Sequence, residues 1–565
     1  MSLWVALLIA LAAFTSRATN VFAADASAQA SQVDRLFGSQ SNPTSPGCAV
    51  AVMKDGHLAY EHGYGMADLD HNVKITRATV FYVGSMSKQF TAMAILMLVQ
   101  DGRISLDDPI RKYVPEVPDF GVPITLRQML AHTSGLRDYE QLLWFDGWRL
   151  DSPDLLTDGD VSYIVSRQKE LNFPPGSDYA YSNTNYELLG HVVSRVSGQS
   201  LQQFTTARIF EPLGMQHTHF RQNHGEVIRD LATPYEDSRG VFLVSVPNYD
   251  TVGATNVVTT LDDLARWDQN LYLGRIGGPE LVRQLLEPGK LKDGIPLTYG
   301  NGWFVNNLGS LKIEETGAAG DAGYIAGMTR FPDQHLSVAI LCNLASIDPQ
   351  ALGIRIGDIY LNGRVSAAIA ASKAPAPAQL RLSPELSAKV VGTYVAPGEN
   401  FILKIQRLPD GLWAHWFWGP SSINGQIETL AENRLRFPGI EQMDLGIDGN
   451  VSLKERGSGM RLRSTEYTRV PEYQPREADL LQFSGTYSSK ELDVPLAVSL
   501  EGPRLILRTP KAAPCLLVAL ARDLFVGSGM RVRFTRDSRG AVSGLLLSGR
   551  WNRVQNLRFE RMAAP

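Results

Sequence analysis

The chain has 565 residues, of which 44% are hydrophobic and 20% charged, and its formal net charge is −4 at pH 7. This balance is typical of a folded protein and excludes a disordered chain, while the length predicts two to four domains. The sequence has no long run of lysine or arginine, so neither nucleic acid nor an anionic membrane surface is expected as a partner.

The chain opens with an apolar run, Leu3–Phe14, followed by a polar stretch and by the small residues Ala23 and Ala24. The run is too short to span a bilayer and favours a signal peptide over 1–24, although the usual positive charge before it is missing. We therefore expect a protein exported to the periplasm or secreted. No later segment is expected to be transmembrane.

From Gln32 to Asn362, strand-like and helix-like stretches alternate. The first is a hairpin, and the next is a helix that is apolar on nearly every face and therefore belongs in the centre of a domain. The predicted elements are a hairpin of Cys48–Met53 and Leu58–Tyr64, helices at Lys88–Gln100 and Tyr186–Val196, a buried strand at Leu336–Leu341 and a closing helix at Ile354–Leu361.

The three cysteines, Cys48, Cys342 and Cys515, are few and widely spaced. An odd, sparse set of this kind predicts neither a disulfide framework nor a zinc site. We expect all three to be buried as small hydrophobic side chains.

The composition changes at Ala367–Gln379, a stretch rich in alanine and proline that predicts a linker over 366–384. Short β-like runs follow, and the sequence Gly-Thr-Tyr occurs at 392–394 and again at 485–487. Each copy leads into alternating strands and ends in a basic, apolar strand, at 461–463 and 557–559. This repeat predicts two small antiparallel β-barrels or sandwiches, over 385–472 and 478–565.

The sequence Gly-Ser-Met-Ser-Lys at 84–88 opens the predicted central helix. Ser85 and Lys88 lie one turn apart on one face, where the helix N-terminus favours an alkoxide and the lysine can accept the hydroxyl proton. The Ser-x-x-Lys pattern alone is weak, because Ser166 and Lys169 match it as well. The alternative is a serine helix cap followed by a solvated lysine.

A second candidate is Tyr-Ser-Asn at 181–183. Tyr181 offers a phenol for proton transfer, and Asn183 offers an amide that can hold a substrate carbonyl. Tyr360 and Asn362 match the same pattern by chance. A turn that ends in a helix cap at Asn183 is the alternative interpretation.

The segment Phe81–Thr91 resembles the nucleophile segment of the serine β-lactamase-related family, which includes class C β-lactamases, D-alanyl-D-alanine carboxypeptidases, D-aminopeptidases and esterases. Further stretches agree in order: Ile124–Leu130, Ala131–Leu136, Phe173–Leu189, Glu211–Met215 and Asp263–Trp267. The resemblance implies an α+β fold, with a class-C β-lactamase-like domain over 30–365 (an antiparallel sheet flanked by helices, plus a helical subdomain) followed by one or two small β-barrels.

The resemblance also implies roles for single residues. Ser85 would be the acylated nucleophile, Lys88 its base, Tyr181 a proton shuttle and Asn183 a contact to the substrate amide. His132, in the family's His-Thr-Ser-Gly stretch, is expected to be structural. No metal site and no cofactor are expected, and the partner is a small-molecule or peptide substrate; the sequence carries no signal for the oligomeric state.

The third family motif departs from the pattern. Members carry Lys-Thr-Gly or His-x-Gly on a strand beside the site, whereas alternative alignments here put Gly317 or Glu315 at the position of the cation. Backbone groups of Ala318 and Gly320 are still expected to contact the substrate. Without the cation, substrate carboxylates should bind poorly, so we expect an esterase or D-aminopeptidase-like serine hydrolase and not an efficient β-lactamase.

Two alternatives stay open. The chain could be a catalytically weak penicillin-fold sensor or scaffold, or it could bind cell wall through its C-terminal β-domains. The C-terminal half also resembles the paired β-domains of D-aminopeptidase-like members, in which a loop of the last domain can reach the active site. Lys490, Arg504 and Arg508 are candidates to replace the missing cation.

Overall fold

The computed structural model describes residues 27–40, 42–149, 154–317, 322–372, 383–396, 402–418, 421–431, 434–436, 444–447, 453–455 and 465–563. The expected signal peptide over 1–24 lies outside these residues. Within the described ranges, no helix combines the length and the apolar character needed to cross a membrane.

An antiparallel sheet of seven strands forms the middle of the first half of the chain. The predicted hairpin is confirmed at one edge of it, and the predicted buried strand is confirmed next to the hairpin. The strand order is β12 (Tyr299–Gly300), β13 (Trp303–Leu308), β14 (Leu311–Gly317), β15 (Ile325–Phe331), β16 (Leu336–Cys342), β1 (Cys48–Lys54) and β2 (His57–Tyr64).

Alternation along β1 gives the sheet two different buried faces. Val50 and Val52 belong to the apolar cluster that includes α11 (Pro349–Tyr360). Ala49 and Ala51 belong to the larger cluster that includes the central helix. The sheet is therefore covered on both sides, in the α+β arrangement that the resemblance implies.

Helices of the second face carry the residues of interest. The predicted central helix is confirmed as α2 (Lys88–Gln100), which is buried along almost its whole length. It packs against α6 (Asn183–Ser197), which contains the predicted helix Tyr186–Val196 and ends at Gly198 in the left-handed conformation. The other helices near the site are α3 (Leu126–Leu130), α4 (Tyr139–Phe145), α5 (Asp158–Ser166) and α9 (Leu261–Leu273).

The expectation of three unpaired cysteines is wrong for two of them. Cys48 and Cys342 are register partners on the adjacent strands β1 and β16, and a disulfide joins them across 294 residues of sequence. Spacing along the chain carries no signal of such a pair, because the sheet alone makes the two residues neighbours. Cys515 is buried and free, as expected.

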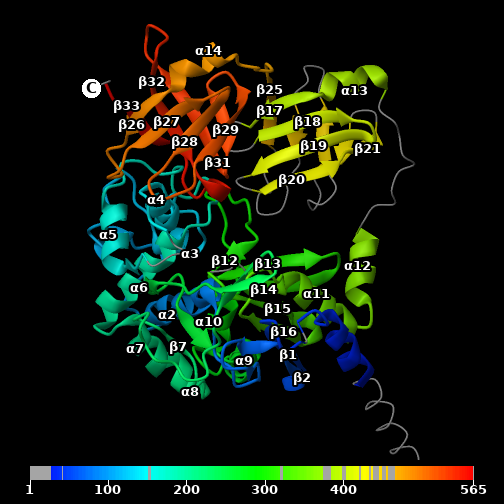
Figure 1. Ribbon diagram of the computed structural model, residues 1–565. Helices are drawn as coiled ribbons and strands as arrows, with labels where there is room; N and C mark the ends of the chain where they lie inside the picture. Colours follow the sequence, from blue (N-terminus) through cyan, green and yellow to red (C-terminus); the bar gives the residue numbers. More distant parts are fainter. Residues whose placement is uncertain are drawn as a thin grey trace, which may run out of the picture.

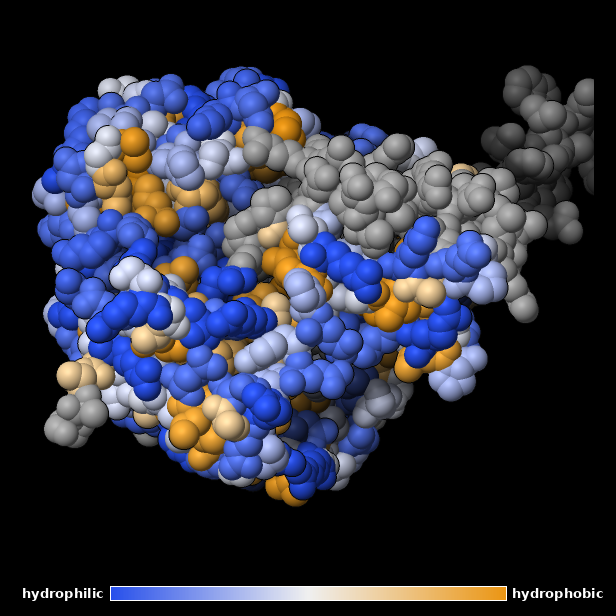
Figure 2. Space-filling view, turned by 90° about the horizontal axis from the view of Figure 1, so that it is seen from above, coloured by the Kyte–Doolittle hydropathy of each residue, from blue (hydrophilic) through white to orange (hydrophobic). Residues whose placement is uncertain are grey.

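Two β-units follow (Figure 1). Eight strands, from β26 (Gly485–Ser488) to β33 (Leu557–Arg561), form a closed barrel that sits on the α3–α5 side of the first half. The other unit is a nine-stranded sheet in which the first strand, β17 (Gly392–Val395), pairs with the last, β25 (Thr465–Val470). Figure 2 shows the face formed by these units, on which hydrophilic side chains predominate.

The Gly-Thr-Tyr repeat has the same structural role in both units. Tyr394 and Tyr487 are completely buried, and each phenol donates a hydrogen bond to the carbonyl oxygen four residues before it, in Val390 and Phe483. The tyrosine thus fastens the first strand of each unit to the segment that enters it. Residues 461–463, expected as the last strand of the first unit, lie outside the described residues.

The expected linker begins too early. Residues 366–372 belong to α12 (Arg364–Ser372), because Val365 and Ala368 are buried against the outer face of the sheet. That burial stabilises a helix where alanine and proline content alone favoured a linker. The proline-rich part of the stretch lies outside the described residues.

Candidate active site

The predicted serine and lysine face each other at the start of the central helix. Ser85 lies in a short 3-10 turn, Gly84–Ser87, that leads directly into α2. The Lys88 Nζ donates a hydrogen bond of 3.0 Å to the Ser85 Oγ. Ser85 is partly exposed whereas Lys88 is only 1% exposed, so the hydroxyl can meet a substrate that the amine cannot reach.

The Lys88 amine has three hydrogen-bond acceptors in all. Besides Ser85, they are the Asn183 Oδ1 at 2.7 Å and the Ala254 carbonyl oxygen at 2.9 Å. Three acceptors match the three N–H groups of an ammonium. Because two of them come from distant parts of the chain, the amine is held in one orientation with the Ser85 hydroxyl beside it.

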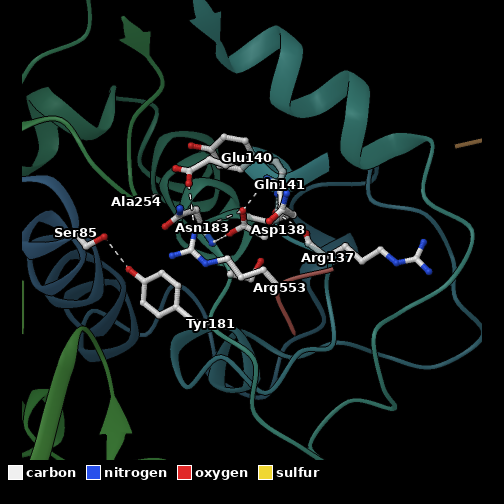
Figure 3. A network of polar contacts seen from close by, with 12 residues as sticks. Ser85, Arg137, Asp138, Glu140, Gln141, Tyr181, Asn183, Ala254 and Arg553 are labelled. Carbon is white, nitrogen blue, oxygen red and sulfur yellow. Dashed lines mark hydrogen bonds and ion pairs between the residues drawn. The ribbon is translucent and has the colours of Figure 1, made fainter. Parts of the chain in front are cut away.

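Tyr181 approaches the same hydroxyl from the other side. Its phenol donates a hydrogen bond of 2.7 Å to the Ser85 Oγ (Figure 3). The Lys88 Nζ also lies 4.9 Å from the centre of the Tyr181 ring. The sequence thus predicted a group of four residues, Ser85, Lys88, Tyr181 and Asn183, and the structure brings all four together.

His132 supports this arrangement without touching Ser85. Its completely buried ring lies 4.4 Å from the Tyr181 ring, its Nδ1 accepts the Ser182 N–H, and its Nε2 bonds the Tyr299 hydroxyl. Burial, together with the charges of Lys88 and Arg553, holds the pKa of His132 well below its ordinary value. A neutral imidazole that orients the phenol agrees with the structural role expected for it.

Asp138 is a site residue that the sequence reasoning missed. It is completely buried, and its Oδ2 accepts the backbone N–H of Asn183 at 2.6 Å. Its Oδ1 accepts the backbone N–H of Gln141 and so caps α4. The carboxylate therefore fixes the start of α6, from which Asn183 reaches Lys88. Its place directly after the family-like stretch 131–136 was the available signal.

Arg553 is the second residue that the sequence reasoning missed. It belongs to the barrel, just before β33, yet its guanidinium lies 5.0 Å from the centre of the Tyr181 ring. Its Nη1 bonds the Glu140 carboxylate at 3.3 Å and lies 3.9 Å from the Asp138 Oδ1. Figure 3 shows the arginine between the phenol and these two acidic side chains.

None of the three cations suggested from the sequence takes that position. Lys490 is 82% exposed and pairs with Glu560, and Arg508 pairs with Glu501 on the barrel itself. Arg504 is exposed on β28 (Arg504–Arg508). The fold of the barrel, which no local pattern reveals, decides which arginine faces the site.

The third motif lies at the end of β14. Thr316 is buried there, and its hydroxyl donates to the Gly302 carbonyl oxygen. The one cation in β14 is Lys312, whose ammonium bonds Glu314 at the other end of the strand. Ala318 and Gly320, expected to contact the substrate, lie outside the described residues.

A family model described as beta-lactamase matches residues 33–357, more than half of the chain. The chain belongs to the beta-lactamase family. This beta-lactamase-family chain is 30% identical over 323 residues to protein flp of Staphylococcus aureus strain MRSA252, a match that covers 53% of the chain and 60% of protein flp. It thus spans about 60% of the length of that curated relative.

Two further comparisons extend beyond the matched family region. The beta-lactamase-family chain is 26% identical over 450 residues to a D-aminopeptidase of Gluconobacter oxydans, with 79% of the chain and 80% of the relative covered. The second is with the structure of the octameric penicillin-binding protein homologue from Pyrococcus abyssi, at 21% identity and a TM-score of 0.55. This match covers 78% of the present chain and 99% of the homologue's chain. The latter likeness shows a shared fold.

Proposed function

We propose that this protein is a serine hydrolase that acts through an acyl-enzyme on ester or amide substrates. The observation that carries the proposal is the Ser85 Oγ, bonded at once by the Lys88 amine and the Tyr181 phenol. A hydroxyl with two proton-transferring partners, partly exposed at the start of a buried helix, is arranged for nucleophilic attack.

The reaction follows from these contacts. Once Lys88 has released a proton, it accepts the proton of the Ser85 Oγ as this oxygen attacks the substrate carbonyl carbon, and a tetrahedral intermediate forms. Tyr181 is placed to give a proton to the departing alcohol or amine as the bond to it breaks, and it regains one from Lys88. Water then attacks the acyl-enzyme, its proton returns through the same groups, and the carboxylic acid leaves Ser85 free.

The charges around the site favour substrates without a carboxylate beside the scissile bond. The cation of the third motif is missing, and Arg553 is already paired with Asp138 and Glu140. A guanidinium that two acidic groups neutralise attracts a further carboxylate weakly. This supports an esterase or a D-aminopeptidase-like enzyme, in keeping with the D-aminopeptidase similarity, over an efficient β-lactamase.

Turnover of short-chain aryl esters, D- and L-aminoacyl anilides and nitrocefin by the same preparation tests this proposal. We expect hydrolysis of an ester or a D-aminoacyl substrate at least about tenfold faster, in kcat/KM, than hydrolysis of the cephalosporin, because one unmet ionic contact is worth about that factor. Fast nitrocefin hydrolysis with negligible activity on the other two classes is the contrary result.

Arg553 offers a second test, of the part that the barrel takes in the reaction. Arg553→Met should lower kcat for a neutral ester about fivefold and leave KM nearly unchanged, because a cation over a phenol ring is worth about 1 kcal/mol. Arg553→Lys should recover part of the loss. Arg508→Met, which removes a barrel arginine away from the site, is the matched control; equal effects of Arg508→Met and Arg553→Met would contradict the assignment.

We also propose that the protein is exported, with 1–24 as the signal peptide. The disulfide between Cys48 and Cys342 supports this, since disulfides persist in oxidising compartments. The N-terminal sequence of the protein recovered from the periplasm or the medium tests it, and recovery of uncleaved protein from the cytosol alone speaks against it.

A further inference from the structure

Three side chains, Asp158, Glu187 and His191, meet between two helices of the helical region. Asp158 is the first residue of α5, and Glu187 and His191 lie one turn apart on α6. One ligand atom from each lies within 4.8 Å of the others. The His191 Nε2 lies 3.7 Å from an Asp158 carboxylate oxygen.

Glu187 makes this group unusual. Its side chain is completely buried, yet neither carboxylate oxygen has a hydrogen-bond partner among the described residues. An unpaired buried carboxyl group costs stability unless something else satisfies it.

Asp158 is partly in the same condition. One of its carboxylate oxygens is buried without a hydrogen bond in the described part of the chain. Neighbouring carboxyl groups with unsatisfied buried oxygens indicate that a ligand or solvent belongs beside them.

We propose that Asp158, Glu187 and His191 form a binding site for a single divalent transition-metal ion, with Zn²⁺ the preferred one. An imidazole with two carboxylates is a donor set suited to zinc, and a Glu and a His four residues apart on a helix project to the same side. Tetrahedral zinc ligands lie about 3.4 Å apart, so a small side-chain movement closes the group around the ion.

The site is accessible from solvent, and an ion bound there would connect two helices. The Asp158 side chain is 45% exposed and that of His191 15% exposed, so an ion can enter from solvent and reach the buried Glu187. Once bound, it links the first turn of α5 to the middle of α6, whose first residue, Asn183, contacts Lys88. The site goes beyond the proposed hydrolase function and beyond the expectation, drawn from the sequence, of no metal.

The experiment uses the full chain, freed of metal with EDTA and then titrated with Zn²⁺. Metal content, calorimetry and thermal unfolding should show one Zn²⁺ per chain and a higher unfolding midpoint with the ion. Glu187→Gln and His191→Ala should each weaken binding at least about tenfold, since even outer partners of metal ligands are worth that much. Mg²⁺ at the same concentration should leave the midpoint unchanged, because it prefers oxygen ligands.

His71→Ala is the matched control, because His71 is an exposed histidine that pairs with Asp68 and not with α5 or α6, so it should leave zinc uptake unchanged. The proposal is overturned if no saturable uptake occurs, or if uptake survives both Glu187→Gln and His191→Ala. Either result would mean that the buried Glu187 carboxyl group is protonated and solvated by water instead. Metal content, calorimetry and thermal unfolding do not depend on turnover, so this test succeeds or fails separately from the hydrolase proposal.

Discussion

Replacing Ser85 with alanine is expected to lower hydrolysis of every substrate the protein turns over by at least about 10³-fold. The reason is structural: the Lys88 amine and the Tyr181 phenol both bond this one oxygen, and they share no other hydroxyl in the part of the chain that the structure describes. Covalent labelling by a fluorophosphonate, followed by intact mass, should show one adduct on the wild-type chain and none on Ser85→Ala.

The chain supplies a matched control for this experiment. Ser166 also stands three residues before a lysine, but its exposed hydroxyl donates to the Tyr163 carbonyl oxygen one turn earlier. Ser166→Ala should therefore keep full labelling and full turnover. An adduct on the Ser85→Ala variant, or activity retained by that variant, would contradict the proposed mechanism.

The largest expected effect on stability concerns the joint between the barrel and the helical region. Arg137 and Glu491 form an ion pair of 2.6 Å, with side chains only 1% and 6% exposed. Arg137 also donates to the Gln555 carbonyl oxygen of the barrel, and Glu491 accepts the Lys169 N–H. Burial lowers the pKa of Arg137, and the Glu491 charge opposes that shift.

Arg137→Met should weaken attachment of the barrel by about 3–5 kcal/mol, because it leaves a buried carboxylate without its partner. Urea unfolding followed by far-UV circular dichroism measures this as a lower midpoint or a new early transition. Catalysis should fall with it, since the next residue, Asp138, fixes the start of α6.

Two further variants separate loss of the pair from loss of an arginine in general. Arg137→Met combined with Glu491→Met should recover most of the stability, because no unpaired charge remains. Arg283→Met removes an arginine whose ion pairs with Glu280 and Glu287 are fully on the surface, and should leave the midpoint unchanged. A single mutant as stable as the wild type would show that the pair does not hold the barrel.

Whether a feature could be predicted from local patterns depends on how far apart its residues are in the sequence. The hairpin, the central helix and the relation of Ser85 to Lys88 follow from patterns within a few residues, and the structure contains all of them. Tyr181 and Asn183 are far from Ser85 in sequence. Their place was predicted from the family resemblance, because spacing alone also selects Tyr360 and Asn362.

The residues that were missed all depend on which surfaces pack together. Asp138 meets Asn183 because α4 and α6 are neighbours, and Arg553 reaches Tyr181 because the barrel sits on the helical region. The choice of Lys490, Arg504 and Arg508 failed for the same reason. A charge pattern shows how many cations a domain has but not which of them its fold turns toward another domain.

By itself, then, the sequence determined the hairpin, the central helix and the pairing of Ser85 with Lys88, since helix and strand periodicity is a property of adjacent residues. Only the tertiary structure decided the Cys48–Cys342 disulfide, the contact of Arg553 with the site and the group around Glu187. These pairings join segments up to several hundred residues apart. Burial of the sheet, the helices and the barrel against one another brings such segments together, and no local preference encodes that packing.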